Sequence, residues 1–147
     1  ISSRIDNGAT FEKAIQEALR EWESGNGKII SGFGHRFHKP IDPRAPRLLE
    51  LVRLAAKENI VSGKYADIAE AIQSHLSIKK DIAMNIDGAT AVIFCELGFP
   101  APLSRGLFCL SRSVGILSHA WEQIEQGGRN KGPMPPKYLP KYISKNT

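Results

Sequence analysis

Apolar residues in this chain recur at spacings of three and four residues, and no segment alternates apolar and polar residues over a sustained run. The pattern is clearest where Thr10 precedes an apolar series from Phe11 to Trp22 that only a helix aligns on one face. Thr10 is a natural N-cap for this helix, and Gly25-Asn26-Gly27 is a natural end. Because the period-two pattern of a half-buried strand is missing, the sequence predicts an all-α fold.

Caps and helix breakers bound four further predicted helices. The first begins near Asp42-Pro43, where aspartate can cap and proline is tolerated in the first turn, and it stops before Ser62-Gly63. The others are expected over 64–76, 87–98 and 104–126. The proline- and lysine-containing segment from 128 to 147 is expected to be an extended basic arm.

Size and charge narrow the class of protein. A chain of 147 residues can bury a core of its own, and 41% apolar with 24% charged residues is a globular composition. The longest apolar run, Ala89 to Cys95, is far shorter than the roughly 20 residues that cross a bilayer, so a membrane protein is excluded. The net charge of +5 is spread along the chain without an aromatic platform, which argues against a nucleic-acid binder.

The two helices predicted over 87–98 and 104–126 are apolar around most of their circumference. Helices of that kind are buried inside something larger than this chain or in an oligomer interface. The chain also begins with Ile1 rather than methionine, and no targeting peptide follows. We therefore expect a processed chain or a piece of a longer protein, and Trp121 on the last helix is expected in a core.

The two cysteines predict neither a disulfide framework nor a metal site. Cys95 and Cys109 have no CxxC partner and no nearby cluster of histidines and cysteines. Both stand among apolar neighbours, which favours buried free thiols. Free thiols are typical of a reducing compartment, so we expect a cytoplasmic protein.

A glycine-containing loop with several basic residues is the first candidate binding site. Gly32 and Gly34 free backbone N–H groups to approach a ligand, and Arg36, Lys39 and Arg44 add positive charge before the next predicted helix. The combination favours an anion site. The alternative is a surface loop whose basic side chains are simply solvated.

Two charged residues on apolar helices are further candidates. Asp87 stands at the head of its helix and is either an N-cap or a carboxylate placed for general acid–base chemistry. Arg112 lies between apolar turns, where a buried charge needs an anionic partner. That partner is either a core carboxylate such as Glu96 or the carboxylate of a substrate.

Taken in order, four segments resemble the C-terminal half of a citrate synthase superfamily enzyme. They are Gly32-Phe33-Gly34-His35, Asp42-Pro43-Arg44, Asn85-Ile86-Asp87 and Leu110-Ser111-Arg112-Ser113-Val114-Gly115. The resemblance runs from about Lys28 to the basic tail. It implies an all-α fold in which residues 1–93 are part of the small, coenzyme A-binding domain. Residues 94–147 would then be the C-terminal part of the large domain with its tail.

The resemblance also implies roles for individual residues. His35 would hydrogen-bond the carbonyl of oxaloacetate, and Asp87 would exchange a proton with the methyl carbon of acetyl-CoA. Arg44 and Arg112 would hold substrate carboxylates, because a guanidinium binds a carboxylate in two places at once.

Coenzyme A esters would be substrates rather than tightly bound cofactors, and no metal is implied. The loop would lie along the coenzyme, with Gly32, Phe33 and Gly34 beside it. The phosphates would meet three basic side chains: Arg36, Lys39 and Lys80.

Gly-Phe-Gly-His-Arg and Ile-Asp-Gly are most similar to citryl-CoA lyase and to the lyase module of ATP-citrate lyase. We therefore expect cleavage of citryl-CoA to acetyl-CoA and oxaloacetate. The alternatives are a citrate or 2-methylcitrate synthase, which condenses acetyl- or propionyl-CoA with oxaloacetate, and a non-catalytic homologue of the fold.

The resemblance leaves part of the site outside this sequence. The family's second catalytic histidine would lie upstream of Ile1, and its arginine donated by a neighbouring subunit has no clean match, with Arg129 or Lys131 as candidates. The expected partners are therefore the N-terminal part of the same protein and further copies in a homodimer or higher homo-oligomer, without nucleic acid or membrane.

Overall fold

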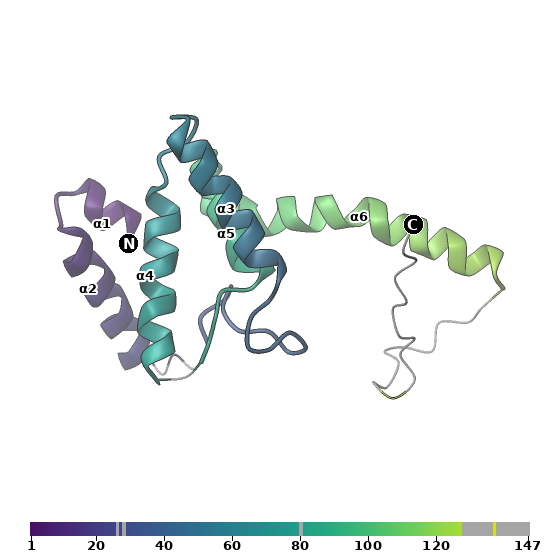
Figure 1. The fold of residues 1–147 in the computed structure, drawn as a ribbon, viewed down its shortest axis with the longest axis horizontal. Helices are drawn as coiled ribbons and strands as arrows, with labels where there is room; N and C mark the ends of the chain where they lie inside the picture. Colours follow the sequence, from purple (N-terminus) through teal and green to yellow (C-terminus); the bar gives the residue numbers. More distant parts are fainter. Residues whose placement is uncertain (26, 28, 80, 128–136, 138–147) are drawn as a thin grey trace. The chain divides into compact units, whose positions relative to one another are not determined.

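The computed structural model describes residues 1–25, 27, 29–79, 81–127 and 137, and within them it contains six helices and no strand (Figure 1). The helices are α1 (Ser2–Asp6), α2 (Phe11–Ser24), α3 (Arg44–Lys57), α4 (Lys64–Lys79), α5 (Ile86–Glu96) and α6 (Ala101–Glu125). The prediction of an all-α fold is confirmed. The chain divides into two compact units, Ile1–Cys109 and Leu110–Thr147, and α6 contributes to both.

Caps and apolar spacings in the sequence predicted the positions of the longer helices well. The Thr10 hydroxyl accepts a hydrogen bond from the backbone N–H of Lys13 at 3.3 Å and caps α2 as predicted. The helix predicted from Asp42 begins instead at Arg44, with Pro43 at the N-cap position. The five-residue α1 was not predicted, because it is too short for apolar periodicity and has no side-chain cap.

The first unit is built around α4. Figure 1 shows α4 with α1 and α2 on one side and α3 and α5 on the other. On the first side, Ile15 and Leu19 of α2 bury against Ile68 of α4, and Ile5 of α1 packs against the same cluster. Burial of this apolar surface holds the two N-terminal helices on the unit.

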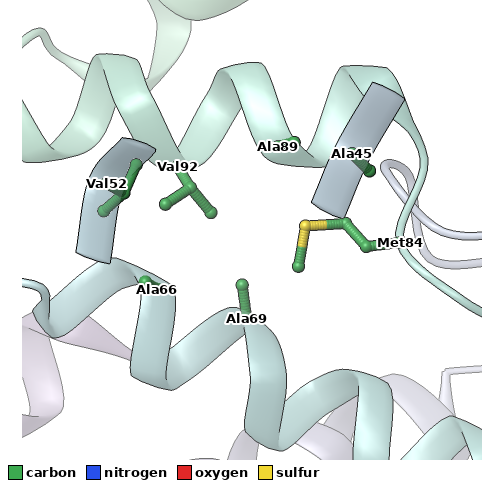
Figure 2. Packing of buried hydrophobic residues seen from close by; sticks show 7 residues of the cluster. All are labelled: Ala45, Val52, Ala66, Ala69, Met84, Ala89 and Val92. Atoms are coloured by element: carbon green, nitrogen blue, oxygen red, sulfur yellow. The ribbon is translucent and has the colours of Figure 1, made fainter. Parts of the chain in front are cut away.

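The main core lies where α3, α4 and α5 meet. Figure 2 shows Met84 reaching between these helices toward small side chains, which allow the helix backbones to approach closely. The buried members of this core are Ala45, Val52, Ala66, Ala69, Met84, Ala89 and Val92. Phe33 of the glycine loop packs against it from outside, so the loop is attached to the same core as α5.

The described part of the second unit is the end of α6 with the turn after it. Its large apolar side chains are exposed, from 61% at Trp121 to 72% at Leu117. Trp121 was predicted to lie in a core, but its side chain is exposed in this unit. The difference arises because helical periodicity identifies an apolar face but says nothing of whether a partner covers it.

Among the described residues, no single helix is long and apolar enough to cross a membrane. Only α5 and α6 counted together, across the break between them, reach that length and apolarity.

Candidate active site

The glycine loop is joined to the segment that leads into α5. The N–H of Gly34 donates to the carbonyl of Ala83 at 2.8 Å, and the N–H of Asn85 donates to the carbonyl of Gly32 at 2.9 Å. The Asn85 amide also donates to the carbonyl of Gly34 at 2.6 Å. These bonds surround an isolated antiparallel bridge between Phe33 and Met84. The loop and the start of α5 therefore form one connected structure.

Two glycines make this approach possible. A Cβ on Gly32, whose φ is +91°, would lie 2.8 Å from the Cα of Gly88, and a Cβ on Gly88 would collide with the carbonyl oxygen of Gly32. Neither neighbour is the end of a flexible side chain. Gly88 follows Asp87 directly, so contact with the loop constrains the first turn of α5 where Asp87 lies.

Asp87 is not the cap of α5. The cap is Asn85, whose Oδ1 accepts hydrogen bonds from the N–H groups of Asp87 at 2.9 Å and Gly88 at 3.1 Å. The N-cap interpretation of Asp87 is therefore wrong. Asp87 is the second residue of the helix, and it is exposed. A carboxylate in this position is free to meet a ligand and is favoured by the helix dipole.

The imidazole of His35 is held in one tautomer. Its Nδ1 accepts hydrogen bonds from the backbone N–H groups of Phe37 and His38, both at 3.0 Å. An Nδ1 that accepts cannot carry the proton, so we assign the proton of the neutral ring to Nε2. The ring of His38 also lies against that of His35, with centroids 4.6 Å apart and the ring planes tilted by 41°. His35 therefore presents Nε2–H as a hydrogen-bond donor.

The guanidinium of Arg44 lies beside that donor. Its Nη2 is 3.4 Å from the Nε2 of His35. A guanidinium only donates, and Nε2–H donates as well, so the two groups do not bond to each other. Both can instead donate to an oxygen of a bound ligand. Adjacent donors of this kind suit a carbonyl that carries a carboxylate next to it.

A buried carboxylate orients Arg44. Asp42 has a side chain only 1% exposed and accepts from the Nε and Nη2 of Arg44, each at 2.9 Å. These bonds hold the pKa of Asp42 far below its usual range and raise that of Arg44. The charge of Asp87 further raises the pKa of Arg44, which places the two within electrostatic reach.

A cavity of about 550 Å³ opens beside Asp87. The glycine loop contributes Ser31 and Gly32, and the first turns of α5 contribute Asp87 and Thr90. The start of α6 adds Arg105 and Phe108, and every lining residue belongs to the first unit. These two α6 residues were not predicted from the sequence, because nothing in helical spacing shows that this helix start faces Asp87.

The remaining predicted residues are placed as follows. Arg36 and Lys39 are exposed on the loop, and the Arg36 guanidinium carbon lies 5.4 Å from the centre of the Phe37 ring. Arg112 lies on α6 in the second unit. Lys80, Arg129 and Lys131 lie outside the described residues.

Glu96, the alternative partner for Arg112, caps α4. Its carboxylate accepts from the N–H groups of Gly63 at 2.9 Å and Tyr65 at 2.7 Å and from the hydroxyl of Ser62 at 2.9 Å. The side chain thus satisfies donors that the start of α4 leaves open. Pairing between Glu96 and a distant helix start was not predicted from the sequence.

The two cysteines differ in exposure. Cys95 is partly buried, and this burial raises the pKa of its thiol, whereas Cys109 is exposed and lines the cavity. The expectation that both thiols are buried is therefore wrong for Cys109. Among the described residues, no three histidine, cysteine, aspartate or glutamate side chains are grouped to hold a metal ion.

The described chain thus has an all-α fold, two adjacent side-chain donors beside a buried aspartate, and a carboxylate at a cavity. Residues 2–134 match the model of the family described as citrate synthase, C-terminal domain. The chain belongs to the citrate synthase family.

Relatives and solved structures agree with this placement. The chain is 35% identical over 114 residues to a citrate synthase of Saccharolobus solfataricus. The aligned region covers 71% of the chain and 30% of that protein. The chain is 29% identical to a probable ATP-citrate synthase subunit 1 of Schizosaccharomyces pombe, covering 79% of the chain and 23% of that protein. The chain thus spans less than a third of these curated relatives.

Two solved structures share the fold. Citryl-CoA lyase from Hydrogenobacter thermophilus superposes with a TM-score of 0.62 and 25% identity, covering 97% of this chain and 53% of the other. Citrate synthase from Thermotoga maritima superposes with a TM-score of 0.55 and 30% identity, covering 86% and 36%. The all-α fold is therefore that of the family.

Proposed function

We propose that this chain is part of an enzyme of the citryl-CoA lyase type, which cleaves citryl-CoA to acetyl-CoA and oxaloacetate. The observation that carries the proposal is the pair of donors formed by His35 Nε2–H and the Arg44 guanidinium, whose Nη2 is 3.4 Å from Nε2. Asp87 supports it from a cavity whose lining includes neither of those two residues. The loop and Ile-Asp-Gly segments resemble lyases. One structural neighbour is a citryl-CoA lyase, and one relative is a probable ATP-citrate synthase subunit.

Each group has one role in this reaction. The citryl hydroxyl loses its proton to water, and His35 Nε2–H donates to the resulting alkoxide, which becomes the carbonyl of oxaloacetate. The carbon–carbon bond breaks, and its electron pair forms the enolate of acetyl-CoA. Asp87 in its acid form then gives a proton to the enolate carbon. Arg44 holds a substrate carboxylate. The resemblance to the family gives Arg112 the same kind of role.

The coenzyme would lie along the glycine loop. Gly32, Phe33 and Gly34 would contact it, and Arg36, Lys39 and Lys80 would meet its phosphates. In this proposal coenzyme A esters are substrates and no cofactor is held tightly. The net charge of +5 suits anionic substrates.

The complete enzyme needs more than this chain. We propose that the remainder of a family fold, including a second catalytic histidine, comes from an N-terminal part of the same protein, and that copies associate as a homodimer or higher oligomer in the cytoplasm. The share of the relatives that the chain spans supports the first part. The exposed apolar residues of α6 support a covering partner.

The second candidate is a citrate or 2-methylcitrate synthase, and the relatives named as citrate synthases favour it. The two differ in the fate of the thioester, since a synthase hydrolyses citryl-CoA and a lyase does not. The enzyme that contains this chain should be given citryl-CoA, with acetyl-CoA measured by chromatography and free thiol by a colorimetric reagent. Acetyl-CoA without free thiol supports a lyase, whereas citrate with free thiol identifies a synthase. No turnover in either direction would favour a non-catalytic homologue.

A further inference from the structure

Asp42 connects two parts of the site that are far apart in the sequence. Its Oδ1 accepts from the side-chain Nε of Arg44 at 2.9 Å and from the backbone N–H of the same residue at 3.2 Å. Its Oδ2 accepts from the Nη2 of Arg44 and from the backbone N–H of Ile86, each at 2.9 Å. One buried carboxylate therefore accepts three hydrogen bonds from Arg44 at the start of α3 and one from Ile86 at the start of α5.

The bond to Ile86 completes the start of α5. The first N–H groups of a helix have no partner within the helix and need acceptors from elsewhere. Asn85 supplies the acceptor for Asp87 and Gly88, and Asp42 supplies it for Ile86. The first three N–H groups of α5 are thus all satisfied by these two side chains.

We propose that Asp42 is a positioning residue that couples the orientation of the Arg44 guanidinium to the start of α5, and through it to Asp87. Within the proposed lyase, this sets the substrate-carboxylate contact at a fixed separation from the proton carrier. Asp42 itself is fully enclosed and does not touch the substrate. The coupling rests on contacts within the ligand-free chain, so it can be tested without catalysis.

The alternative is that Asp42 only stabilises the fold. A buried ion pair can do so without linking two sites, and loss of one partner is strongly destabilising in either case. Stability alone therefore cannot separate the two roles. A change made at Arg44 and read at Ile86 and Asp87 can, because Arg44 and Ile86 both donate to the Asp42 carboxylate and Asp87 follows Ile86 in the same turn of α5.

The first experiment changes Arg44, the exposed partner of Asp42. Arg44→Gln in the 147-residue chain removes the two side-chain donors, and its side chain is 43% exposed, so the fold should persist. We expect the ¹⁵N NMR signals of the Ile86 and Asp87 amides to move, and Ile86 to exchange with solvent about tenfold faster or more. The matched control is Arg47→Gln, whose exposed ion pair with Glu50 lies on the same helix. In this control, the changes in the NMR signals should be confined to residues near Glu50.

The second experiment changes Asp42 itself, the acceptor that Arg44 and Ile86 share. Asp42→Asn has the same shape, but its amide turns a donor toward either Ile86 N–H or Arg44, so one donor loses its acceptor. We expect the Arg44 Nε–H signal and the Ile86 amide signal to move together. The proposal is overturned if Arg44→Gln leaves Ile86 and Asp87 unchanged, whatever Asp42→Asn does to stability. If the NMR signals change as expected but the wild-type complete enzyme does not cleave citryl-CoA, the lyase proposal is contradicted and the positioning role of Asp42 stands.

Discussion

Asp87 occupies the second position of α5 with an exposed carboxylate, while Asn85 makes the cap. Asp87→Asn should therefore cost less than about 1 kcal/mol of stability, through the helix dipole alone. If Asp87 carries the proton, the same change in the complete enzyme should lower kcat by roughly 10²–10⁴-fold. Thermal unfolding and steady-state kinetics measure the two effects.

Asn85→Ala is the matched control, because it removes the cap and keeps the carboxylate. It should cost about 1–3 kcal/mol of stability, because alanine removes the cap and also the donor to the Gly34 carbonyl. A variant Asp87→Asn that retains more than about a tenth of the activity would remove Asp87 from the mechanism.

Two exposed cations of the loop test the proposed coenzyme site. Changing Arg36 and Lys39 to alanine should raise the KM for the coenzyme A ester and largely spare kcat, because neither residue is assigned a role in bond cleavage. Each charged contact is worth about 1.5–3 kcal/mol when dry and less on the surface. Competition by free coenzyme A should weaken in parallel. An unchanged KM would place the coenzyme elsewhere.

Asp42 makes the stability of the fold sensitive to acid. Hydrogen bonds, first those from the Arg44 side chain, hold its pKa far below the ordinary aspartate value of about 3.9. A carboxyl with a depressed folded-state pKa stabilises the fold fully above the ordinary value, and this contribution is lost as the pH falls below it. The difference in unfolding free energy between wild type and Asp42→Asn should therefore be constant from pH 7 to about pH 5 and shrink toward pH 2. A difference that stays constant to pH 2 would contradict the assignment.

At the residue scale, the sequence identified side chains by their chemistry but not by their neighbours. His35, Arg44 and Asp87 were all named in advance, and the structure places the Arg44 guanidinium beside His35 and within electrostatic reach of Asp87. The functions given to them stay predictions. Asp42 was interpreted only as a possible helix cap, because its contact with Ile86 spans 44 residues and depends on tertiary folding. The position of Arg105 at the cavity also depends on tertiary folding, so it was not predicted from the sequence.

At the scale of elements, the close approach of the glycine loop to α5 makes a prediction about stability. Gly88→Ala would place a methyl group against the Gly32 carbonyl, so the loop or the helix must shift. We expect a loss of about 1–3 kcal/mol, measured by urea unfolding of the chain. Gly106→Ala is the matched control, since a Cβ there meets nothing within 4 Å and alanine favours a helix by about 1 kcal/mol. If Gly88→Ala were as stable as wild type, the loop contact would not constrain α5.

Elements were predictable where the signal was local. The Thr10 cap of α2 and the apolar stripes of α2, α3, α4 and α5 follow from residues within a few positions of each other. These helices agree with the prediction to within a few residues. The start of α4 is different. Its donors are satisfied by Glu96, more than 30 residues away, and no local pattern contains that information.

At the scale of the whole molecule, the end of α6 presents an apolar stripe that no described residue of its own unit covers. Leu110, Val114, Leu117, Trp121 and Ile124 recur at alternating spacings of four and three, and each is at least 61% exposed. This is the spacing of a helix that packs along a seam with other helices. The chain covers 53% of the solved citryl-CoA lyase that it resembles in fold.

The stripe predicts the behaviour of the isolated chain. An exposed apolar surface of this length drives association, so residues 1–147 should sediment as a dimer or larger species whose proportion rises with concentration. Val114→Glu with Leu117→Glu places charges on the stripe and should shift the distribution toward monomer. His119→Glu is the control, because its side chain is 83% exposed and lies off the stripe. A compact monomer of the wild-type chain at all concentrations would show that the stripe does not self-associate. Association that survives the paired glutamates would place the contact on another surface.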